Sequence, residues 1–173
     1  NDLAEIDYER VNNTKHEYLR LVFAQDFSNT AQTGEYKKFI AANEYWLLPW
    51  AVWSVLRDEY HTPDNNNRPV LSSYNEDEVR AYADKHREKV DYYFFMQYHL
   101  DRQLREARDY ANRYGVVLKG DIPIGVSRFS ADAWTNPRLF NMDCQAGAPP
   151  DDFSVLGQNW GLPTYNWDVM AED

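Results

Sequence analysis

A long helical pattern that ends at a glycine and continues into an apolar run constrains the fold of this chain most strongly. Between Arg87 and Tyr114, apolar and aromatic side chains recur at steps of three and four residues, which predicts one long helix. Gly115 is expected to end it, because glycine readily adopts the left-handed conformation that follows many helices. The run Val116–Leu118 is typical of a buried parallel strand. A helix that leads into a core strand is half of a βα-type unit.

The residues before this run are predicted to be mostly helical, because only two glycines, Gly34 and Gly115, occur among the first 119 residues. We expect Pro49 to lie near the start of a helix, where its missing N–H costs least. Asn75 is expected to cap another helix. The expected segments are a break at 28–34, helices at 35–42, 44–57 and 75–86, and a loop at 60–70.

Three tryptophans, Trp46, Trp50 and Trp53, share one face of the predicted helix at 44–57. Such a stripe serves either as a platform for sugar rings or as part of the helix core. Of these two interpretations we favour the core, because an apolar stripe at helical spacing normally packs against neighbouring elements.

Charge and composition exclude several classes of partner. The formal net charge of -10 disfavours nucleic acid and anionic membranes, which require a basic surface. No apolar run approaches the length of a membrane span, about 18 residues. The single cysteine, Cys144, and the absence of a visible signal peptide favour a reduced, cytoplasmic setting. Four scattered histidines and no phosphate-binding or dinucleotide motif predict neither a metal nor a cofactor.

Asp121 stands where the apolar stretch Val116–Val126 is interrupted, two residues before Pro123. In α/β folds the carboxyl end of a core strand is where catalytic and binding side chains usually lie. The alternative is an aspartate that only caps a neighbouring loop. The sequence indicates an active-site carboxylate but leaves both interpretations open.

A proline- and glycine-rich stretch at 135–168 is predicted to be an irregular functional loop, because structureless segments of that length are unusual in compact domains. Asp151 offers acceptor oxygens to sugar hydroxyls, and Gln158 both donates and accepts. Trp160 offers a flat apolar face to a pyranose ring. Together these residue types predict a carbohydrate-binding cleft.

The stretches GDIPIGVS, GAPPDDF and GQNWGLPTYNW occur in this order, after NEYWLLPWAVWSVLRD and YANRYGVVLKGDIPIGV. In this order and spacing they resemble the 4-α-glucanotransferase family (amylomaltase or disproportionating enzyme, glycoside hydrolase family 77). The resemblance covers most of residues 36–170, and the wording of the motifs is similar to the larger, disproportionating-enzyme-2-like branch.

The resemblance implies a mainly α fragment with one or two short strands, part of a (β/α)8 TIM barrel with a helical insertion. Residues 1–114 are expected to form a helical subdomain, and 115–173 a barrel strand with a substrate-covering loop. It further implies transfer of α-1,4-glucan segments between malto-oligosaccharides by a retaining double displacement, with an aspartate nucleophile and a glutamate acid/base. Asp121 matches the aspartate that lines the cleavage site. Asp151, Gln158 and Trp160 match the mobile loop that covers the donor sugars.

One departure from the family pattern changes the expectation for the isolated chain. The family's nucleophile lies in an Arg-x-Asp-His motif, which does not occur in this sequence. We therefore expect an internal fragment, inactive alone, whose partners are a malto-oligosaccharide or α-glucan and the remainder of the barrel. Exposed barrel interface is expected to favour oligomers. The alternatives are a non-catalytic helical carbohydrate-binding or scaffold module, and a hydrolase of the same clan.

Overall fold

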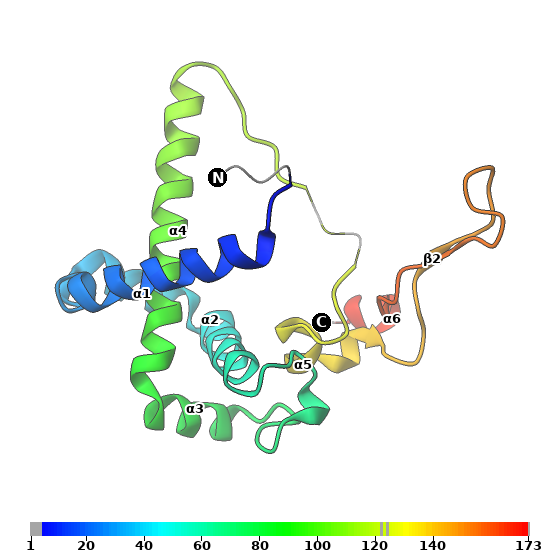
Figure 1. The fold of residues 1–173 in the computed structure, drawn as a ribbon, viewed down its shortest axis with the longest axis horizontal. Helices are drawn as coiled ribbons and strands as arrows, with labels where there is room; N and C mark the ends of the chain where they lie inside the picture. The colour runs from blue at the N-terminus through cyan, green and yellow to red at the C-terminus, as the bar shows by residue number, and fades with distance from the viewer. Residues whose placement is uncertain (1–4, 122, 124, 173) are drawn as a thin grey trace. The chain divides into compact units, whose positions relative to one another are not determined.

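The computed structural model describes residues 5–121, 123 and 125–172, and these are mainly helical with two small sheets (Figure 1). The chain divides into two compact units, Asn1–Leu47 with His86–Leu118 and Leu48–Lys85 with Lys119–Asp173. The elements in chain order are α1 (Tyr8–Gln32), α2 (Gly34–Tyr60), η1 (Asn65–Asn67), α3 (Glu76–Lys85), α4 (Arg87–Arg113), α5 (Ala131–Thr135), η2 (Pro137–Leu139), β1 (Phe140–Asn141), β2 (Gly147–Ala148), β3 (Gln158–Asn159), β4 (Thr164–Tyr165) and α6 (Trp167–Met170).

The expected break at 28–34 is confined to a single residue, Thr33. Helix α1 begins at a capping Asp7, whose side chain accepts from the Arg10 amide at 2.9 Å. Thr33 has an extended backbone, and its hydroxyl donates to Thr30 O at 2.8 Å and accepts from the Tyr36 amide at 3.2 Å. The threonine thus ends α1 and caps α2 at the same time.

Helix α2 is one continuous helix where two were predicted, and Pro49 lies inside it. An interior proline costs about 3 kcal/mol in a helix. Leu47, Val52 and Leu56 are fully buried around it, and each such side chain contributes about 1.5–3 kcal/mol on burial. Burial therefore outweighs the lost hydrogen bond, and the helix continues through the proline.

Helices α3 and α4 confirm the local predictions. The Asn75 side chain accepts from the Glu78 amide at 3.0 Å. Helix α4 spans Arg87–Arg113 and is followed by Gly115 with a φ of 72°. The amide of Val116 returns to Ala111 O at 3.0 Å, so the glycine closes the helix end as expected.

The prediction of a buried parallel strand at Val116–Leu118 is wrong for this structure. Val117 is 82% exposed, and none of these residues belongs to a strand. An apolar run becomes a parallel strand only where neighbouring strands supply its hydrogen-bond partners. The strands among the described residues pair antiparallel elsewhere in the chain.

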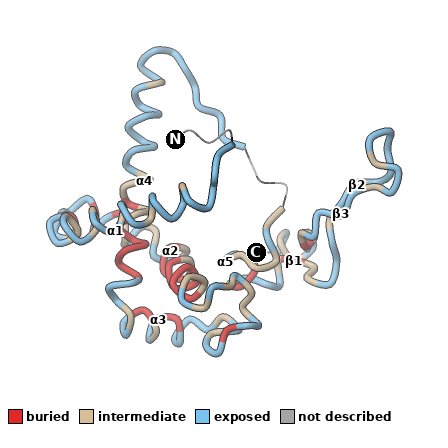
Figure 2. Tube along the Cα trace, in the orientation of Figure 1, coloured by how far each residue is buried: buried red, intermediate tan, exposed pale blue. Residues whose placement is uncertain are grey.

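The core of the first unit is a chain of aromatic rings contributed by α1, α2 and α4. Phe23 meets Phe95 at 5.5 Å between ring centroids, Phe27 meets Tyr36 at 6.3 Å, and Tyr36 meets Tyr98 at 5.2 Å. All three pairs are edge-to-face, the favoured geometry for aromatic packing. In Figure 2, buried positions occupy the first half of α4, whereas its second half is exposed.

The second unit contains the C-terminal half of α2, where Trp53 is buried beside two guanidinium groups. Arg57 and Arg68 lie 5.2 Å and 5.5 Å from the Trp53 ring centroid. Arg68 is itself buried and donates to Thr62 O and Pro63 O. The core interpretation of the tryptophan stripe is confirmed for Trp53.

The segment predicted to be irregular forms a nested antiparallel ribbon in the second unit. The outer pair β1–β4 matches Phe140 with Tyr165, and the inner pair β2–β3 matches Gly147 with Asn159. Asn166 extends the ribbon at its base by donating its amide to Leu139 O at 2.9 Å. Pro149, Pro150 and Gly157 lie between β2 and β3, where the chain turns.

Within the described ranges, no helix is both long and apolar enough to cross a membrane. The division at 114/115 that the sequence suggests between a helical subdomain and a barrel segment stays a prediction.

His99 in α4 generates a prediction about stability and pH. Its ring packs against Phe95 at 4.3 Å, and burial, followed by repulsion from Arg102, lowers the pKa of His99 below its usual 6.5, while Asp26 opposes this shift. The folded state then binds fewer protons than the unfolded state, so stability is lost as pH falls through the unfolded pKa. The variant His99→Gln should lose less unfolding free energy than the wild type between about pH 7.5 and pH 5.

Urea denaturation at a series of pH values measures this difference. His61→Asn is the control, because His61 is exposed and its positive φ of 52° suits asparagine. Equal slopes for the wild type and His99→Gln would contradict the assignment.

Candidate functional site

The candidate site lies on the inner part of the ribbon, where two of the predicted site residues meet. Gln158 and Trp160 are two residues apart on one extended arm, so their side chains lie on the same face. The indole Nε1 of Trp160 donates to Oε1 of Gln158 at 3.1 Å. The pairing continues beyond β3, because the Trp160 amide donates to Ala146 O at 3.0 Å. The structure therefore positions an aromatic face and an amide together.

Asp151 organises the turn of the inner hairpin. Its Oδ1 accepts from the amides of Phe153 at 2.9 Å and Ser154 at 2.7 Å. The hydroxyl of Ser154 donates to Gly157 O at 2.7 Å, which closes the turn. Among the described residues, no hydrogen bond is made by the second carboxylate oxygen of Asp151. These hydrogen bonds of Asp151 do not involve Gln158 or Trp160.

The tip of the hairpin exposes three large apolar side chains. Phe153, Val155 and Leu156 are 97%, 84% and 94% exposed. The sequence analysis missed Val155 and Leu156, although an apolar pair inside a proline- and glycine-rich loop was a usable signal. A group of fully exposed apolar side chains usually marks a surface that another part of a protein or a ligand covers.

Two glycines are needed for the hairpin to close. A Cβ at Gly147 would overlap Gln158 O of the facing strand. Gly157 has a φ of 71°, and a Cβ there would lie 2.6 Å from Ala148 O. A side chain at either position would separate the two strands that hold Gln158.

Asp121 is exposed and belongs to the same compact unit as the hairpin. It lies in the extended segment that leads toward α5, and the hydrogen bonds that hold Asp151, Gln158 and Trp160 do not include it. Two residues beside it, Ile122 and Ile124, are outside the described residues. Asp121 as an active-site carboxylate stays a prediction.

The base of the ribbon is fastened by aromatic and guanidinium contacts. The Tyr165 ring lies 5.8 Å from that of Phe140 and 5.0 Å from that of Trp167. Arg128 donates to Met142 O at 2.7 Å, at the start of the arm that leads to β2. These contacts support the arms on which the candidate residues lie.

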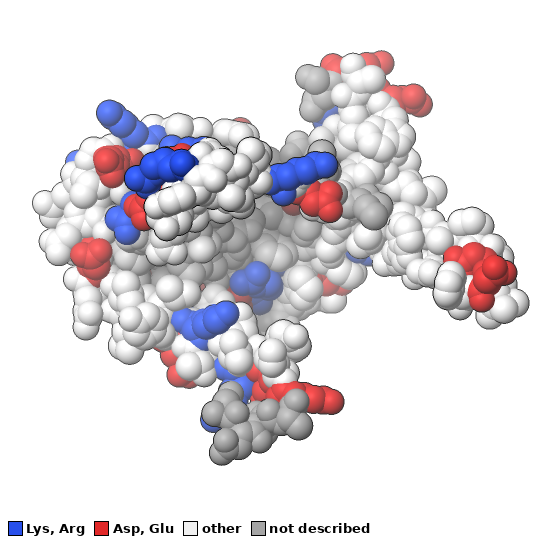
Figure 3. Space-filling model, turned by 90° about the horizontal axis from the view of Figure 1, so that it is seen from above, with Lys and Arg blue, Asp and Glu red and all other residues white. Residues whose placement is uncertain are grey.

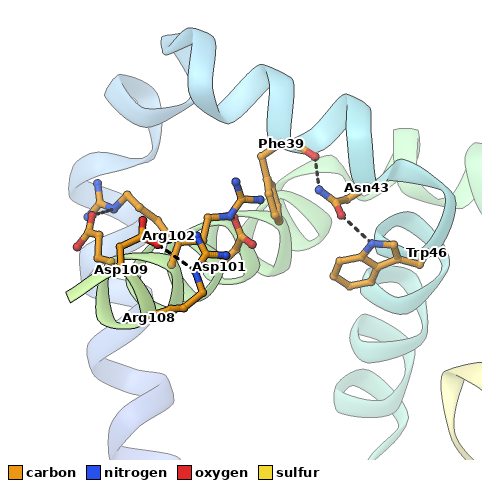
Figure 4. A network of polar contacts seen from close by, with 9 residues as sticks. Phe39, Asn43, Trp46, Asp101, Arg102, Arg108 and Asp109 are labelled. Carbon is orange, nitrogen blue, oxygen red and sulfur yellow. Dashed lines mark hydrogen bonds and ion pairs between the residues drawn. The ribbon is translucent and has the colours of Figure 1, made fainter. Parts of the chain in front are cut away.

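The first unit contains a separate polar network and a cleft of about 450 Å³ beside it. Asn43 donates to Phe39 O at 2.8 Å and accepts from Trp46 Nε1 at 3.0 Å, while α4 presents intrahelical ion pairs such as Arg108–Asp109 at 2.7 Å (Figure 4). A further pair in α4 joins Arg105 and Asp101 at 2.9 Å. Because the arginines and aspartates pair with each other, the network stabilises the helices. None of the predicted site residues lines this cleft.

Over the face seen in Figure 3, acidic and basic side chains are interspersed. In the part of the chain that the structure describes, no group of three or more histidine, cysteine, aspartate or glutamate side chains could hold a metal ion. At the hairpin, the Gln158–Trp160 pair offers hydrogen bonding and apolar ring contact.

The close packing of Gly157 generates a prediction. Gly157→Ala should destabilise the hairpin by about 1–3 kcal/mol, because alanine resists a positive φ and its Cβ would press on Ala148 O. Hydrogen exchange at the amides of Ala146 and Trp160 should then accelerate about tenfold or more.

Gly34→Ala is the matched control, since nothing lies within 4 Å of a Cβ at that position. Unchanged exchange in Gly157→Ala would show that the hairpin does not require glycine there.

Comparison with known proteins identifies the relatives of this chain. A family described as 4-alpha-glucanotransferase matches residues 1–173. The rice (Oryza sativa subsp. japonica) 4-alpha-glucanotransferase DPE2 is 38% identical over 175 residues, which cover 99% of this chain and 18% of the relative. A 4-alpha-glucanotransferase of Streptococcus pneumoniae is 31% identical over 184 residues, which cover 99% of this chain and 35% of the relative.

A solved structure, the amylomaltase from Streptococcus agalactiae in complex with acarbose, superposes with a TM-score of 0.85. It is 29% identical, and the match covers 96% of this chain and 35% of that chain. The chain thus spans between about a fifth and about a third of the length of these relatives. Since the family match extends over all of its residues, the chain belongs to the 4-alpha-glucanotransferase family.

Proposed function

We propose that the full-length protein carrying these residues is a 4-α-glucanotransferase that moves α-1,4-glucan segments between malto-oligosaccharides. The observation that carries this proposal is the family match over residues 1–173. The substrate class is supported by the related amylomaltase, which was solved in complex with acarbose. The reaction is a retaining double displacement, in which a covalent glycosyl-enzyme forms and is then resolved by the 4-hydroxyl of an acceptor sugar.

In this proposal the chain contributes substrate binding, while the rest of the protein contributes the nucleophilic aspartate and the acid/base glutamate. Residues 1–114 form the helical subdomain, and 115–173 form a segment of a (β/α)8 barrel with its substrate-covering loop. The chain alone is then inactive. The complete barrel acts in the cytoplasm and requires no cofactor. The exposed apolar surface of the chain pairs with the remainder of the barrel or, in isolation, with other copies.

The geometry at Gln158 and Trp160 suits a donor sugar. The Trp160 indole donates to Oε1 of Gln158, so Nε2 of the Gln158 amide can donate to a sugar hydroxyl. The Trp160 ring, still 43% exposed, offers an apolar face to the C–H face of a pyranose. Asp151 accepts from a second hydroxyl through its free carboxylate oxygen.

The exposed tip of the hairpin supports the choice of transfer over hydrolysis. Transfer prevails only if a sugar, not water, reaches the glycosyl-enzyme in the second step. A tip formed by Phe153, Val155 and Leu156 covers bound sugar with apolar atoms and excludes water. A hydrolase of the same clan would release reducing sugar without making longer chains.

Asp121 is proposed to line the site of cleavage, and this role predicts a large kinetic effect. Asp121→Asn in the full-length protein should lower the rate of maltotriose disproportionation about 100-fold or more, because a charged acceptor of substrate hydroxyl groups becomes a neutral amide. Chromatography of glucose and longer maltodextrins measures the rate.

Asp143→Asn is the matched control, since Asp143 is an exposed aspartate of the same unit. Turnover by Asp121→Asn at the wild-type rate would remove Asp121 from the site. If the wild-type protein itself makes no maltodextrins longer than its substrate, the transferase proposal fails in favour of a hydrolase or a non-catalytic binding module.

Trp160→Ala tests the donor-binding role of the hairpin. Loss of the ring should raise KM for maltotriose about three- to tenfold with a smaller effect on kcat, because the ring contacts sugar in the ground state and in the transition state alike. Tyr45→Ala, which removes an exposed aromatic side chain of α2 outside the ribbon, is the comparison. An unchanged KM in Trp160→Ala would count against the assignment.

A further inference from the structure

We propose that a separate cavity in the second unit is an accessory binding subsite for an α-glucan chain, an inference that rests on the proposed transferase function. The cavity has a volume of about 530 Å³, which lies in the range of small-molecule sites, about 300–1,000 Å³. Asp121, Asp151, Gln158 and Trp160 do not line it. It is therefore distinct from the hairpin site.

The aromatic wall of this cavity is held rigidly. Trp134 is buried, and its indole donates to Leu71 O at 3.2 Å. The Tyr74 ring meets it edge-to-face at 5.3 Å and remains partly exposed in the wall. Leu71 itself has a φ of 53°, a left-handed conformation that is uncommon for leucine and is retained where the surroundings require it. The partly exposed Tyr74 ring, held in place by the buried Trp134, suits the apolar face of a pyranose ring.

Several polar groups of the cavity keep hydrogen-bonding capacity for a ligand. Oδ1 of Asn65 is buried and has no partner among the described residues. The hydroxyls of Ser72 and Ser73 are exposed on the rim. Burial, followed by the nearby Glu76, raises the pKa of Tyr74, so its hydroxyl stays a donor at neutral pH. Amide, hydroxyl and phenol groups are the partners that sugar hydroxyls use.

The charged side chains that line the cavity are engaged in hydrogen bonds with neighbouring backbone and amide groups. Arg128 donates to Met142 O at 2.7 Å and to Cys144 O at 3.3 Å. Asp64 accepts from the Asn66 amide at 3.0 Å and from the Asn67 side chain at 2.9 Å. Both side chains are therefore fixed in place by hydrogen bonds to neutral groups, and a neutral glucan requires no oppositely charged partner from them.

The decisive experiment is titration calorimetry with maltoheptaose on the full-length protein in an Asp121→Asn background, which slows turnover during the titration. We expect two classes of binding sites. Ser73→Trp fills the cavity from an exposed rim position and should abolish one class. The double variant Ser72→Ala/Ser73→Ala removes only the hydroxyls and should weaken that class about tenfold. Trp160→Ala should weaken the other class instead.

Ser28→Trp is the control, because Ser28 is an exposed serine in α1, far from the cavity in sequence and in the other unit; both classes should remain. The subsite is overturned if both classes of binding sites remain in Ser73→Trp and in the double alanine variant. It is also overturned if the protein shows a single class that only Trp160→Ala removes, or if maltoheptaose does not bind. If the wild-type protein does not lengthen maltodextrins but Ser73→Trp still abolishes one class of binding sites, the transferase proposal fails and the subsite stands. If transfer occurs and Ser73→Trp keeps both classes of binding sites, the transferase proposal stands and the subsite fails.

Discussion

The antiparallel backbone pairing of the ribbon is the interaction on which the candidate site depends. It starts where the Asn166 amide donates to Leu139 O and reaches the pair Ala148–Gln158. Because side chains alternate along each arm, this register decides that Gln158 and Trp160 face the same way. Gly147 and Gly157 allow the two arms to approach closely, and Asp151 closes the turn between them. A shift by one residue would direct both side chains to the opposite face.

The hairpin and the cavity of the second unit use the same physical strategy. In each, an indole N–H is already bound to a neighbouring oxygen, Gln158 Oε1 for Trp160 and Leu71 O for Trp134. Each ring is thereby held in a fixed orientation, which is the preorganisation that the two proposed sugar sites require. Arg128 connects the two features, since it lines the cavity and holds the backbone of the ribbon at Met142. The two sugar sites that we propose for this unit suit a long substrate, because occupancy of one raises the effective concentration at the other.

Predictions from the sequence were accurate where a local interaction decides the structure. The Asn75 cap, the length of α4 and the stop at Gly115 each involve residues within one or two helical turns, so their signals are contained in a short stretch. Pro49 shows the opposite case: its local preference for a helix start was overridden by burial of Leu47 and Val52. Val116–Leu118 was misread because apolar composition indicates burial but not the partner strand that burial requires. The ribbon was read as irregular because its pairs join residues up to about 25 positions apart.

The sequence by itself determined the family, the helical character of the first two thirds and the residue types suited to sugar binding, because these depend on composition, spacing and motif order. Only the tertiary structure decided which of those residues meet. It brought Gln158 to Trp160, turned Asp151 toward its own loop, left the hairpin tip exposed and built a cavity from Asn65, Tyr74 and Trp134, which are distant in sequence. The physical reason is that side-chain hydrogen bonds and ring contacts act over only a few ångströms, so their partners are chosen by the folded backbone.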